Sequence, residues 1–216
     1  MAEFPVAKFP GGIYAITPET ADTEHLLAQV EAALAGGVAA VQYRDKSGDV
    51  ARRHEQASEL VALCRQFGVP LIVNDDLRLA DLCEADGIHL GRDDASLREA
   101  RIILGKDKLI GASCYQSLER ALAAQAAGAD YVAFGSFFAS PTKPAAGRAG
   151  LDLLREASPR IHVPLVAIGG ITLENAPQLL DAGADSLAVL SALFDTPDIR
   201  AAARALNHLF ETESEQ

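Results

Sequence analysis

Acidic and amide side chains directly follow two apolar segments of this 216-residue chain. The segment "PLIVNDD" ends in Asn74, Asp75 and Asp76, and "HLGRDD" ends in Asp93 and Asp94. Such oxygen ligands suit Mg²⁺, which binds one or two carboxylates and fills its other positions with water and substrate phosphates. Helix capping is the competing interpretation, because carboxylates are also favoured just before a helix and in its first turn. Two clusters on neighbouring segments favour the metal.

A third segment places cations beside an amide. In "QYRDKS", Gln42, Arg44 and Lys46 alternate, so an extended chain would direct all three side chains to one side. An amide followed by two cations suits a ligand with a polar ring and an anionic group. The alternative is a charged surface loop in which Arg44 pairs with Asp45.

A long segment, "GSFFASPTKPAAGRAG" at 135–150, carries hydroxyls beside a lysine. Connections of this length are uncommon within compact domains, and they are often functional. Ser140, Thr142 and Lys143 suit phosphate oxygens, and the segment could fold over a ligand as a lid. Surface disorder is the alternative interpretation.

Three further positions suit ligand binding. Ser113 in "GASCYQS" is a binding hydroxyl or a helix cap, since no paired histidine and acid mark it as a nucleophile. Gly170 in "AIGGI" and Ser191 in "VLSAL" each follow an apolar segment and precede a helical pattern. Backbone N–H groups at such positions bind phosphate, and glycine lets the main chain approach closely. A simple turn is the alternative at Gly170.

These residues need a frame that brings the ends of successive segments together. Eight short runs are apolar on both faces, which is typical of buried parallel strands. We expect strands at 12–17, 38–43, 69–74, 86–90, 109–113, 130–135, 163–169 and 185–190. Helical patterns rich in Ala, Leu, Glu and Arg lie between them, for example at 22–37, 49–68, 117–128 and 172–183, and several end at a glycine.

Eight strand–helix alternations predict an α/β protein with a single-domain (β/α)8 TIM barrel, and a doubly wound open sheet is the alternative. The domain would span 1–216, with a short N-terminal extension at 1–11 and a polar C-terminal tail at 211–216. In such a barrel the active site lies at the C-terminal ends of the strands, where the candidate residues fall.

Composition restricts the partners. A formal net charge of −11 argues against nucleic acid and anionic membranes, both of which require clustered cations. Three widely spaced cysteines, no signal-like start and no long apolar run favour a cytoplasmic protein with reduced thiols. The five histidines are scattered, so no zinc site is expected, and His89 is interpreted as a packed, hydrogen-bonded residue.

Taken together, the ordered motifs resemble the thiamine-phosphate synthase (thiamine-phosphate pyrophosphorylase) family over most of the chain. The matching motifs are "VQYRDK" at 41–46, "IVNDD" at 72–76, "IHLGRDD" at 88–94, "IGAS" at 110–113, "ASPTK" at 139–143, "AIGGI" at 167–171 and "LSAL" at 190–193. The resemblance implies an enzyme of thiamine biosynthesis, a transferase that condenses 4-amino-2-methyl-5-hydroxymethylpyrimidine diphosphate with 4-methyl-5-(2-hydroxyethyl)thiazole phosphate. The products would be thiamine monophosphate and diphosphate.

The resemblance also assigns site residues. The pyrimidine diphosphate would contact Gln42, Tyr43, Arg44, Asp45, Lys46, Asn74, Ser113 and Lys143. The thiazole phosphate would contact Ser140, Pro141, Thr142, Gly170, Leu190 and Ser191. Mg²⁺ would be the cofactor, bound by Asp75 and Asp94, and the catalytic residues would be Arg44, Lys46, Lys143 and Ser113.

The implied mechanism is dissociative, because cations around the departing diphosphate would stabilise the charge that develops on it. The chain departs from the family pattern at Ser140, Pro144 and Arg92, where threonine, lysine and glutamine are common. The missing lysine would weaken diphosphate binding. The sequence leaves a homo-oligomer and any contribution of Asp76 or Asp93 to the metal site open.

Two alternative functions use the same barrel. A thiazole tautomerase-like isomerase would need a histidine near the end of the fifth strand, where this chain has "ASCYQS". A non-catalytic phosphate-binding barrel would need neither Lys143 nor both metal-ligand aspartates. The intact motifs therefore favour the synthase.

Overall fold

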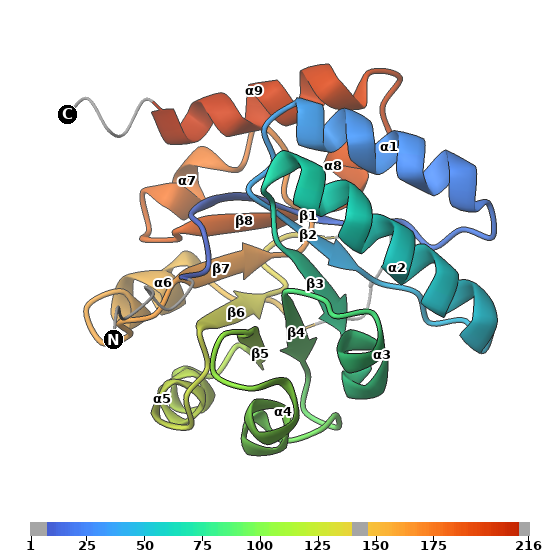
Figure 1. Cartoon of the computed structure of the whole chain (residues 1–216). Helices are drawn as coiled ribbons and strands as arrows, with labels where there is room; N and C mark the ends of the chain where they lie inside the picture. Colours follow the sequence, from blue (N-terminus) through green and yellow to red (C-terminus); the bar gives the residue numbers. More distant parts are fainter. Residues whose placement is uncertain (1–7, 140–146, 212–216) are drawn as a thin grey trace, which may run out of the picture.

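The computed structural model describes residues 8–139 and 147–211 (Figure 1). The expectations for Ser140, Pro141, Thr142, Lys143 and Pro144 fall outside these residues. Within the described part of the chain, no helix is both long and apolar enough to cross a membrane.

Eight parallel strands form a closed barrel in chain order, and β1 pairs with both β2 and β8. The strands are β1 (Gly12–Ile16), β2 (Ala40–Tyr43), β3 (Leu71–Asn74), β4 (Gly87–Leu90), β5 (Leu109–Tyr115), β6 (Tyr131–Gly135), β7 (Leu165–Ile168) and β8 (Ser186–Val189). Seven of the eight runs expected from the sequence contain one of these strands, and β5 extends two residues beyond the run expected at 109–113. The predicted single-domain TIM barrel is confirmed, and the doubly wound alternative is wrong because the sheet closes.

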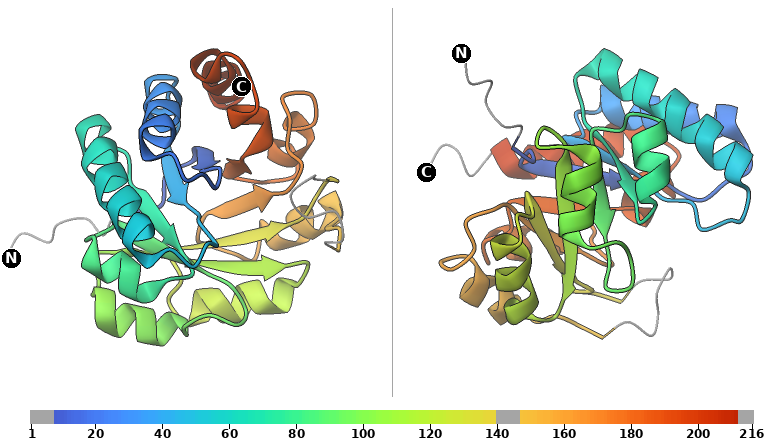
Figure 2. Two further views of the ribbon diagram at one scale, coloured as in Figure 1. Left: turned by 90° about the vertical axis from the view of Figure 1, so that its right-hand side faces the viewer. Right: turned by 60° about the horizontal axis from the view of Figure 1, so that its bottom comes forward.

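Helices form a layer outside the strands (Figure 2). They are α1 (Thr23–Ala35), α2 (Val50–Phe67), α3 (Leu77–Leu82), α4 (Leu97–Leu104), α5 (Leu118–Ala126), α6 (Leu151–Ala157), α7 (Pro177–Leu180), α8 (Ser191–Phe194) and α9 (Ile199–Glu211). The expected glycine stop is clearest at α2, where Gly68 is left-handed with φ of 67° and donates to carbonyls of the last turn.

One helix is much shorter than its sequence pattern. The pattern at 172–183 predicts a continuous helix, but α7 covers only Pro177–Leu180. The Asn175 side chain accepts from the Thr172 N–H at 2.8 Å and donates to the Gly170 carbonyl at 3.0 Å, which makes a turn. Gly170 therefore precedes a turn and not a helix, and Pro177 occupies the first helical turn, where its missing N–H costs nothing.

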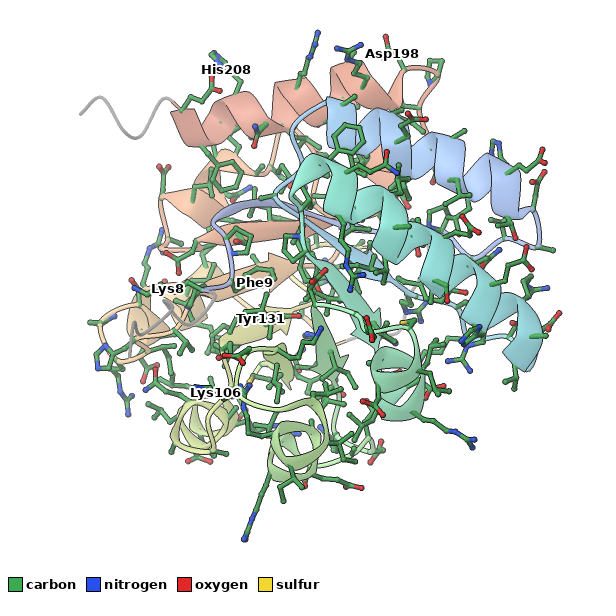
Figure 3. The ribbon with its side chains drawn as sticks, viewed as in Figure 1. Lys8, Phe9, Lys106, Tyr131, Asp198 and His208 are labelled. Carbon is green, nitrogen blue, oxygen red and sulfur yellow. The ribbon has the colours of Figure 1, made fainter. Side chains whose placement is uncertain are left out.

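Aromatic side chains fill the interior of the barrel. Tyr14 and Tyr131 project inward from β1 and β6, and Phe9 stacks on the Tyr131 ring with centroids 3.9 Å apart. Figure 3 shows Phe9 and Tyr131 at the end of the barrel where the strands begin. Phe9 is 3% exposed, so the segment before β1 closes this end with an apolar plug.

A repeated aspartate fixes the starts of three strands. An aspartate immediately precedes each of β4, β6 and β8: Asp86, Asp130 and Asp185 respectively. Each belongs to an "AD" motif that ends a helix-to-strand connection. Each carboxylate accepts from the first N–H, or the next one, of the preceding strand, at 2.9, 2.7 and 2.7 Å respectively. Each aspartate N–H also donates back to that strand. We call these residues the aspartate clamps.

Candidate active site

Side chains at the end of β2 point alternately into and out of the barrel, as in any β-strand. The Gln42 side chain points into the barrel and donates to the Tyr14 hydroxyl at 2.8 Å. The next side chain, Tyr43, points outward and donates to Gln56 of α2 at 2.9 Å. Asp45 is also directed away from the mouth, because its carboxylate accepts from the Ser47 N–H at 2.6 Å and its side chain is 1% exposed. Tyr43 and Asp45 thus shape the loop with their side chains.

The two cations after β2 lie at the mouth side of the barrel. The Arg44 N–H donates to the buried Thr17 hydroxyl at 3.0 Å, which anchors the loop to the end of β1. The Lys46 N–H donates to Glu19 at 3.0 Å, and its ammonium forms an ion pair with Asp75. Lys46 therefore links the loop after β2 to the loop after β3.

Asp75 and Asp94 meet across the ends of β3 and β4. Their carboxyl groups are hydrogen-bonded to each other, and one Asp94 oxygen also accepts from the Gly91 N–H at 2.6 Å. Burial acts to raise the pKa of Asp75, but the hydrogen bonds with Lys46 and Asp94 and the charge of Lys46 together outweigh burial and hold that pKa below its usual value. Burial and the Asp75 carboxylate raise the pKa of Asp94.

This donor set fits a divalent cation. Two carboxylates brought together repel each other unless a proton or a cation lies between them, and here an ammonium already binds one of them. A pair of carboxylates with room for water and phosphate is the protein contribution that Mg²⁺ requires. Among the described residues, no group of three or more His, Cys, Asp or Glu side chains gathers as a complete metal cage.

The neighbouring acids have structural roles. Asp76 caps α3, accepting from the Leu79 N–H at 2.9 Å, and it pairs with Arg53 at 2.9 Å. Ser96, and not Asp94, caps α4. The capping interpretation therefore holds for Asp76, whereas Asp75 and Asp94 face each other.

Ser113 belongs to a chain of hydrogen bonds that crosses the barrel. His89 is 7% exposed, and its Nε2 lies 2.8 Å from the Ser113 Oγ. Its Nδ1 lies 3.0 Å from the Tyr131 hydroxyl, and that hydroxyl lies 2.8 Å from the Tyr14 hydroxyl. The Tyr14 hydroxyl accepts a hydrogen bond from Gln42, so this chain of hydrogen bonds joins two predicted substrate-binding residues, Gln42 and Ser113. His89 is packed and hydrogen-bonded, as expected from the sequence.

The described ends of the loop after β6 are held together by one amide. Gln116 Nε2 donates to the Gly135 carbonyl at 2.5 Å and to the Gly147 carbonyl at 2.9 Å. The start of the loop also follows the end of β7, since the Phe138 N–H donates to the Gly169 carbonyl at 3.0 Å. The base of the loop is thus fixed to β5 and β7.

Gly170 lies against this loop. Its φ is 63°, and a Cβ there would come within 2.3 Å of the Ala139 carbonyl oxygen. A side chain at this position would therefore require the loop to move. Leu190 and Ser191 follow β8, where the Leu190 carbonyl accepts from the N–H groups of Leu193 and Phe194 in α8. The ends of β7 and β8 thus place main chain at the mouth beside the loop after β6.

Sequence reasoning missed Tyr14, Tyr131 and Gln116. The strands "GIYAI" and "DYVAFG" give no sign of which face each tyrosine occupies, because both faces of a barrel strand are buried. The amide of Gln116 follows β5 with nothing in its sequence context to mark a contact across the loop.

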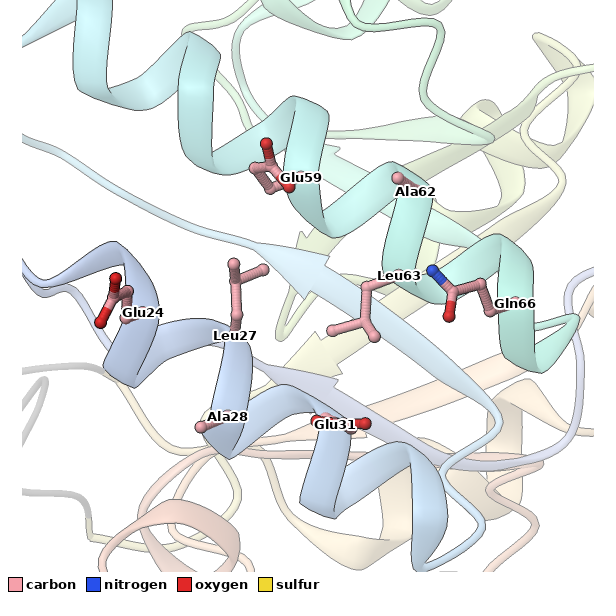
Figure 4. A pocket seen from close by; sticks show the side chains of 8 residues that line it. All are labelled: Glu24, Leu27, Ala28, Glu31, Glu59, Ala62, Leu63 and Gln66. Carbon is pink, nitrogen blue, oxygen red and sulfur yellow. The ribbon is translucent and has the colours of Figure 1, made fainter.

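Two hollows lie elsewhere on the molecule. A hollow of about 380 Å³ lies between α1 and α2, lined by Leu27, Leu63 and several glutamates (Figure 4). A second, of about 460 Å³, lies where β6 to β8 begin and includes Asp130 and Asp185. Neither hollow is lined by described residues from the C-terminal strand ends.

Comparison with known proteins identifies the family. Residues 13–193 match the family described as Thiamine monophosphate synthase. The chain belongs to this family. A thiamine-phosphate synthase of Thiobacillus denitrificans is 76% identical over 208 residues, which cover 96% of this chain and 99% of the relative. Its counterpart from Nitrosospira multiformis is 52% identical over 203 residues, with coverage of 94% and 87%.

A solved structure of similar fold carries a matching name. The thiamine phosphate pyrophosphorylase of Pyrococcus furiosus superposes with a TM-score of 0.83 at 35% identity, covering 93% of this chain and 96% of the other. The resemblance drawn from the motifs is confirmed, as are the thiamine-phosphate synthase function and the transferase class that it implied.

Proposed function

We propose that the barrel mouth condenses the aminopyrimidine diphosphate with the thiazole phosphate by dissociative loss of diphosphate. The observation that carries this mechanism is the joining of Lys46, Asp75 and Asp94 at adjacent strand ends. Beside them lie the two ends of the buried hydrogen-bond chain, Gln42 and Ser113. The mouth thus offers charged groups for the diphosphate and neutral polar groups for the pyrimidine ring of the same substrate.

The pyrimidine diphosphate binds between the loops after β2, β3 and β5. Gln42, Asn74 and Ser113 supply neutral polar groups for the ring, and Arg44 and Lys46 supply charge for the diphosphate. Tyr43 and Asp45 contribute by fixing the loop, because their side chains bond to Gln56 and Ser47.

Asp75 and Asp94 would hold Mg²⁺, since their carboxyl groups meet at the ends of β3 and β4. When bound, Mg²⁺ supplies positive charge that stabilises the diphosphate as it leaves. Lys46 pairs with Asp75 before the substrate binds, and its half-exposed ammonium then turns to the phosphate oxygens. Asp93 is exposed at the surface of its loop and has no assigned part.

The thiazole phosphate binds on the opposite side of the mouth. Gly170, Leu190 and Ser191 supply main-chain groups there, together with Ser140, Pro141 and Thr142. The last three residues and Lys143, which would contact the diphosphate, lie outside the described residues.

The chain's own residues then govern the reaction by charge and position. Negative charge develops on the leaving oxygen as the C–O bond breaks, and Arg44, Lys46 and Lys143 stabilise it where it forms. Ser113 and Gln42 hold the ring so that its methylene carbon faces the thiazole nitrogen. The electron-rich ring stabilises the methylene cation, and so the reaction requires no protein nucleophile.

Variants of the three aspartates test this proposal. The purified protein is incubated with both substrates, with Mg²⁺ or with a chelator, and thiamine monophosphate is quantified. Asp75→Ala and Asp94→Ala should each lose at least about 100-fold in kcat, because less positive charge reaches the leaving group.

Asp76→Ala is the matched control for these variants. It removes an adjacent carboxylate that caps α3, so it should lower stability by about 1 kcal/mol and leave turnover near the unsubstituted rate. Calorimetric titration of Mg²⁺ with diphosphate gives a readout independent of turnover. Product formation that is unaffected by chelation would contradict the metal assignment.

A further inference from the structure

A chain of buried hydrogen-bonding side chains crosses the barrel. It runs from Gln42 through Tyr14, Tyr131 and His89 to Ser113, with contacts of 2.8 to 3.0 Å. The five residues come from β2, β1, β6, β4 and β5 in that order. Tyr14 is 2% exposed and Tyr131 is 0% exposed, so water cannot satisfy their hydroxyls and each proton needs a protein acceptor.

The direction follows from the amide at one end. Gln42 Nε2 donates to the Tyr14 hydroxyl, so the Tyr14 proton goes to the Tyr131 oxygen, its other partner among the described residues. The Tyr131 proton then goes to the Nδ1 of His89. Because Nδ1 accepts, the imidazole carries its proton on Nε2 and donates it to the Ser113 Oγ.

Both phenols are suited to pass on this direction without ionising. Burial raises the pKa of Tyr14 and that of Tyr131 well above the usual value, so both remain neutral donors. Phe9 stacks on Tyr131 and meets Tyr14 edge-on at 5.0 Å between centroids, which limits the ring orientations.

The two ends of the chain then present opposite groups. Since Gln42 uses an N–H inside the barrel, its Oε1 has no hydrogen-bond partner among the described residues and remains an acceptor. Since Ser113 accepts from His89, its own hydroxyl proton is left to donate outward. A ring with an exocyclic amine and a ring nitrogen matches an acceptor and a donor.

We propose that Tyr14, Tyr131 and His89 are positioning residues that fix the hydrogen-bond direction of the site, with Gln42 as acceptor and Ser113 as donor to an aminopyrimidine. This inference rests on the proposed function for the identity of the ring. The three residues act through Gln42 and Ser113, and so their loss affects recognition of one substrate and not the other.

The test combines imidazole NMR with kinetics on the full chain. Protein labelled with ¹⁵N-histidine should show His89 as the Nε2–H tautomer, assigned by the signal missing in His89→Gln. In Tyr131→Phe the Nδ1 loses its donor, so the tautomer preference should shrink. KM for the pyrimidine diphosphate should rise about tenfold, as expected for one disrupted hydrogen bond, with KM for the thiazole phosphate unchanged.

Two further variants separate direction from packing. Tyr14→Phe leaves the Tyr131 donor in place, so it should keep the His89 tautomer and still raise the pyrimidine KM. Phe9→Leu disturbs packing on both phenol rings without removing a hydrogen bond, and it should keep the tautomer and both KM values.

Several results would overturn the proposal. They are a wild-type His89 protonated on Nδ1, or a Tyr131→Phe protein whose tautomer and pyrimidine KM match the wild type. If Tyr131→Phe does not fold, the wild-type spectrum and Tyr14→Phe decide. Failure of the wild type to form product would refute the proposed function. The histidine NMR spectrum would still test the direction of the hydrogen bonds between Gln42 and Ser113.

Discussion

At the scale of single residues, adjacent aspartates at the end of β3 do different work. Asp75 pairs with Lys46 and Asp94, whereas Asp76 caps α3 and pairs with Arg53. The backbone at Asp75 is left-handed, with φ of 62°, a conformation that few non-glycine residues adopt. This turn separates the two carboxylates, so that one faces the mouth and the other the helix.

Asp45 makes stability depend on pH. Burial acts to raise its pKa, but hydrogen bonds from Ser47 and the charge of Arg52 lower the pKa below 3.8. A lowered folded-state pKa means that the unfolded chain binds the proton more readily, so this stabilisation is present above the ordinary value and is lost as pH falls through the folded value. Asp45→Asn should therefore lose less stability than the wild type between about pH 5 and pH 3.

Urea denaturation of both proteins at a series of pH values measures this difference. Parallel stability curves for Asp45→Asn and wild type would show that the carboxylate contributes nothing specific.

Residue types predicted the site region but not each residue's role. A metal ligand and a helix cap can both be aspartate just before a helix, so the sequence could not separate Asp75 from Asp76. The opposite sides of Gln42 and Tyr43 at the end of β2 could be predicted, because strand alternation is a local rule: Gln42 points inward and Tyr43 outward. The partners of Tyr14 and Tyr131 could not, because they come from strands far apart in the chain.

At the scale of elements, the aspartate clamps fix strand starts. Asp185 accepts from the Leu165 N–H at 2.7 Å and returns a backbone hydrogen bond to the same residue. Asp185→Ala leaves that strand N–H without its acceptor and should lower the free energy of unfolding by about 1–3 kcal/mol. Asp185→Asn keeps an oxygen acceptor and should cost less. Equal losses for the two variants, measured by urea denaturation, would contradict the clamp.

Gly170 couples the end of β7 to the loop after β6. Gly170→Ala combines a left-handed φ with a contact of 2.3 Å to the Ala139 oxygen. It should cost about 1–2 kcal/mol from the backbone conformation alone, and more from the contact. KM for the thiazole phosphate should rise with it. Gly150→Ala is the control, because its φ is −91° and a Cβ there meets nothing within 4 Å.

Element boundaries followed from the sequence where the signals were local. Every expected strand is present, and α2 ends at the glycine that its pattern indicated. The helix expected at 172–183 is wrong over most of its length, because the Asn175 side chain bonds to the backbone and supports a turn. Such competition between side chain and helix is not visible in hydrophobic periodicity.

At the scale of the whole molecule, Phe9 completes the barrel interior from outside the strands. It is 3% exposed and contacts the rings of Tyr14 and Tyr131. Phe9→Ala should lower the free energy of unfolding by about 3–5 kcal/mol, as expected for a large buried aromatic residue. Phe67→Ala, at a position 41% exposed on α2, should cost far less. Similar urea midpoints for the two variants would show that the plug is dispensable.

Barrel closure could be predicted because eight strand–helix units recur. The plug could not, because Phe9 lies before the first strand in a segment without a periodic pattern. Its role depends on which side chains meet on the barrel axis, and that is decided only when all eight strands close.

The aspartate clamps also divide six of the eight strands into three linked pairs. They join β3 to β4, β5 to β6 and β7 to β8, and in the described part of the chain no equivalent carboxylate joins the other neighbouring strands, β1 and β2 included. When the barrel opens locally, neighbouring strands without a clamp should therefore separate before the clamped pairs do. Backbone amide protons between unclamped neighbours should exchange with solvent first, whereas each of the three clamped pairs should open as a unit.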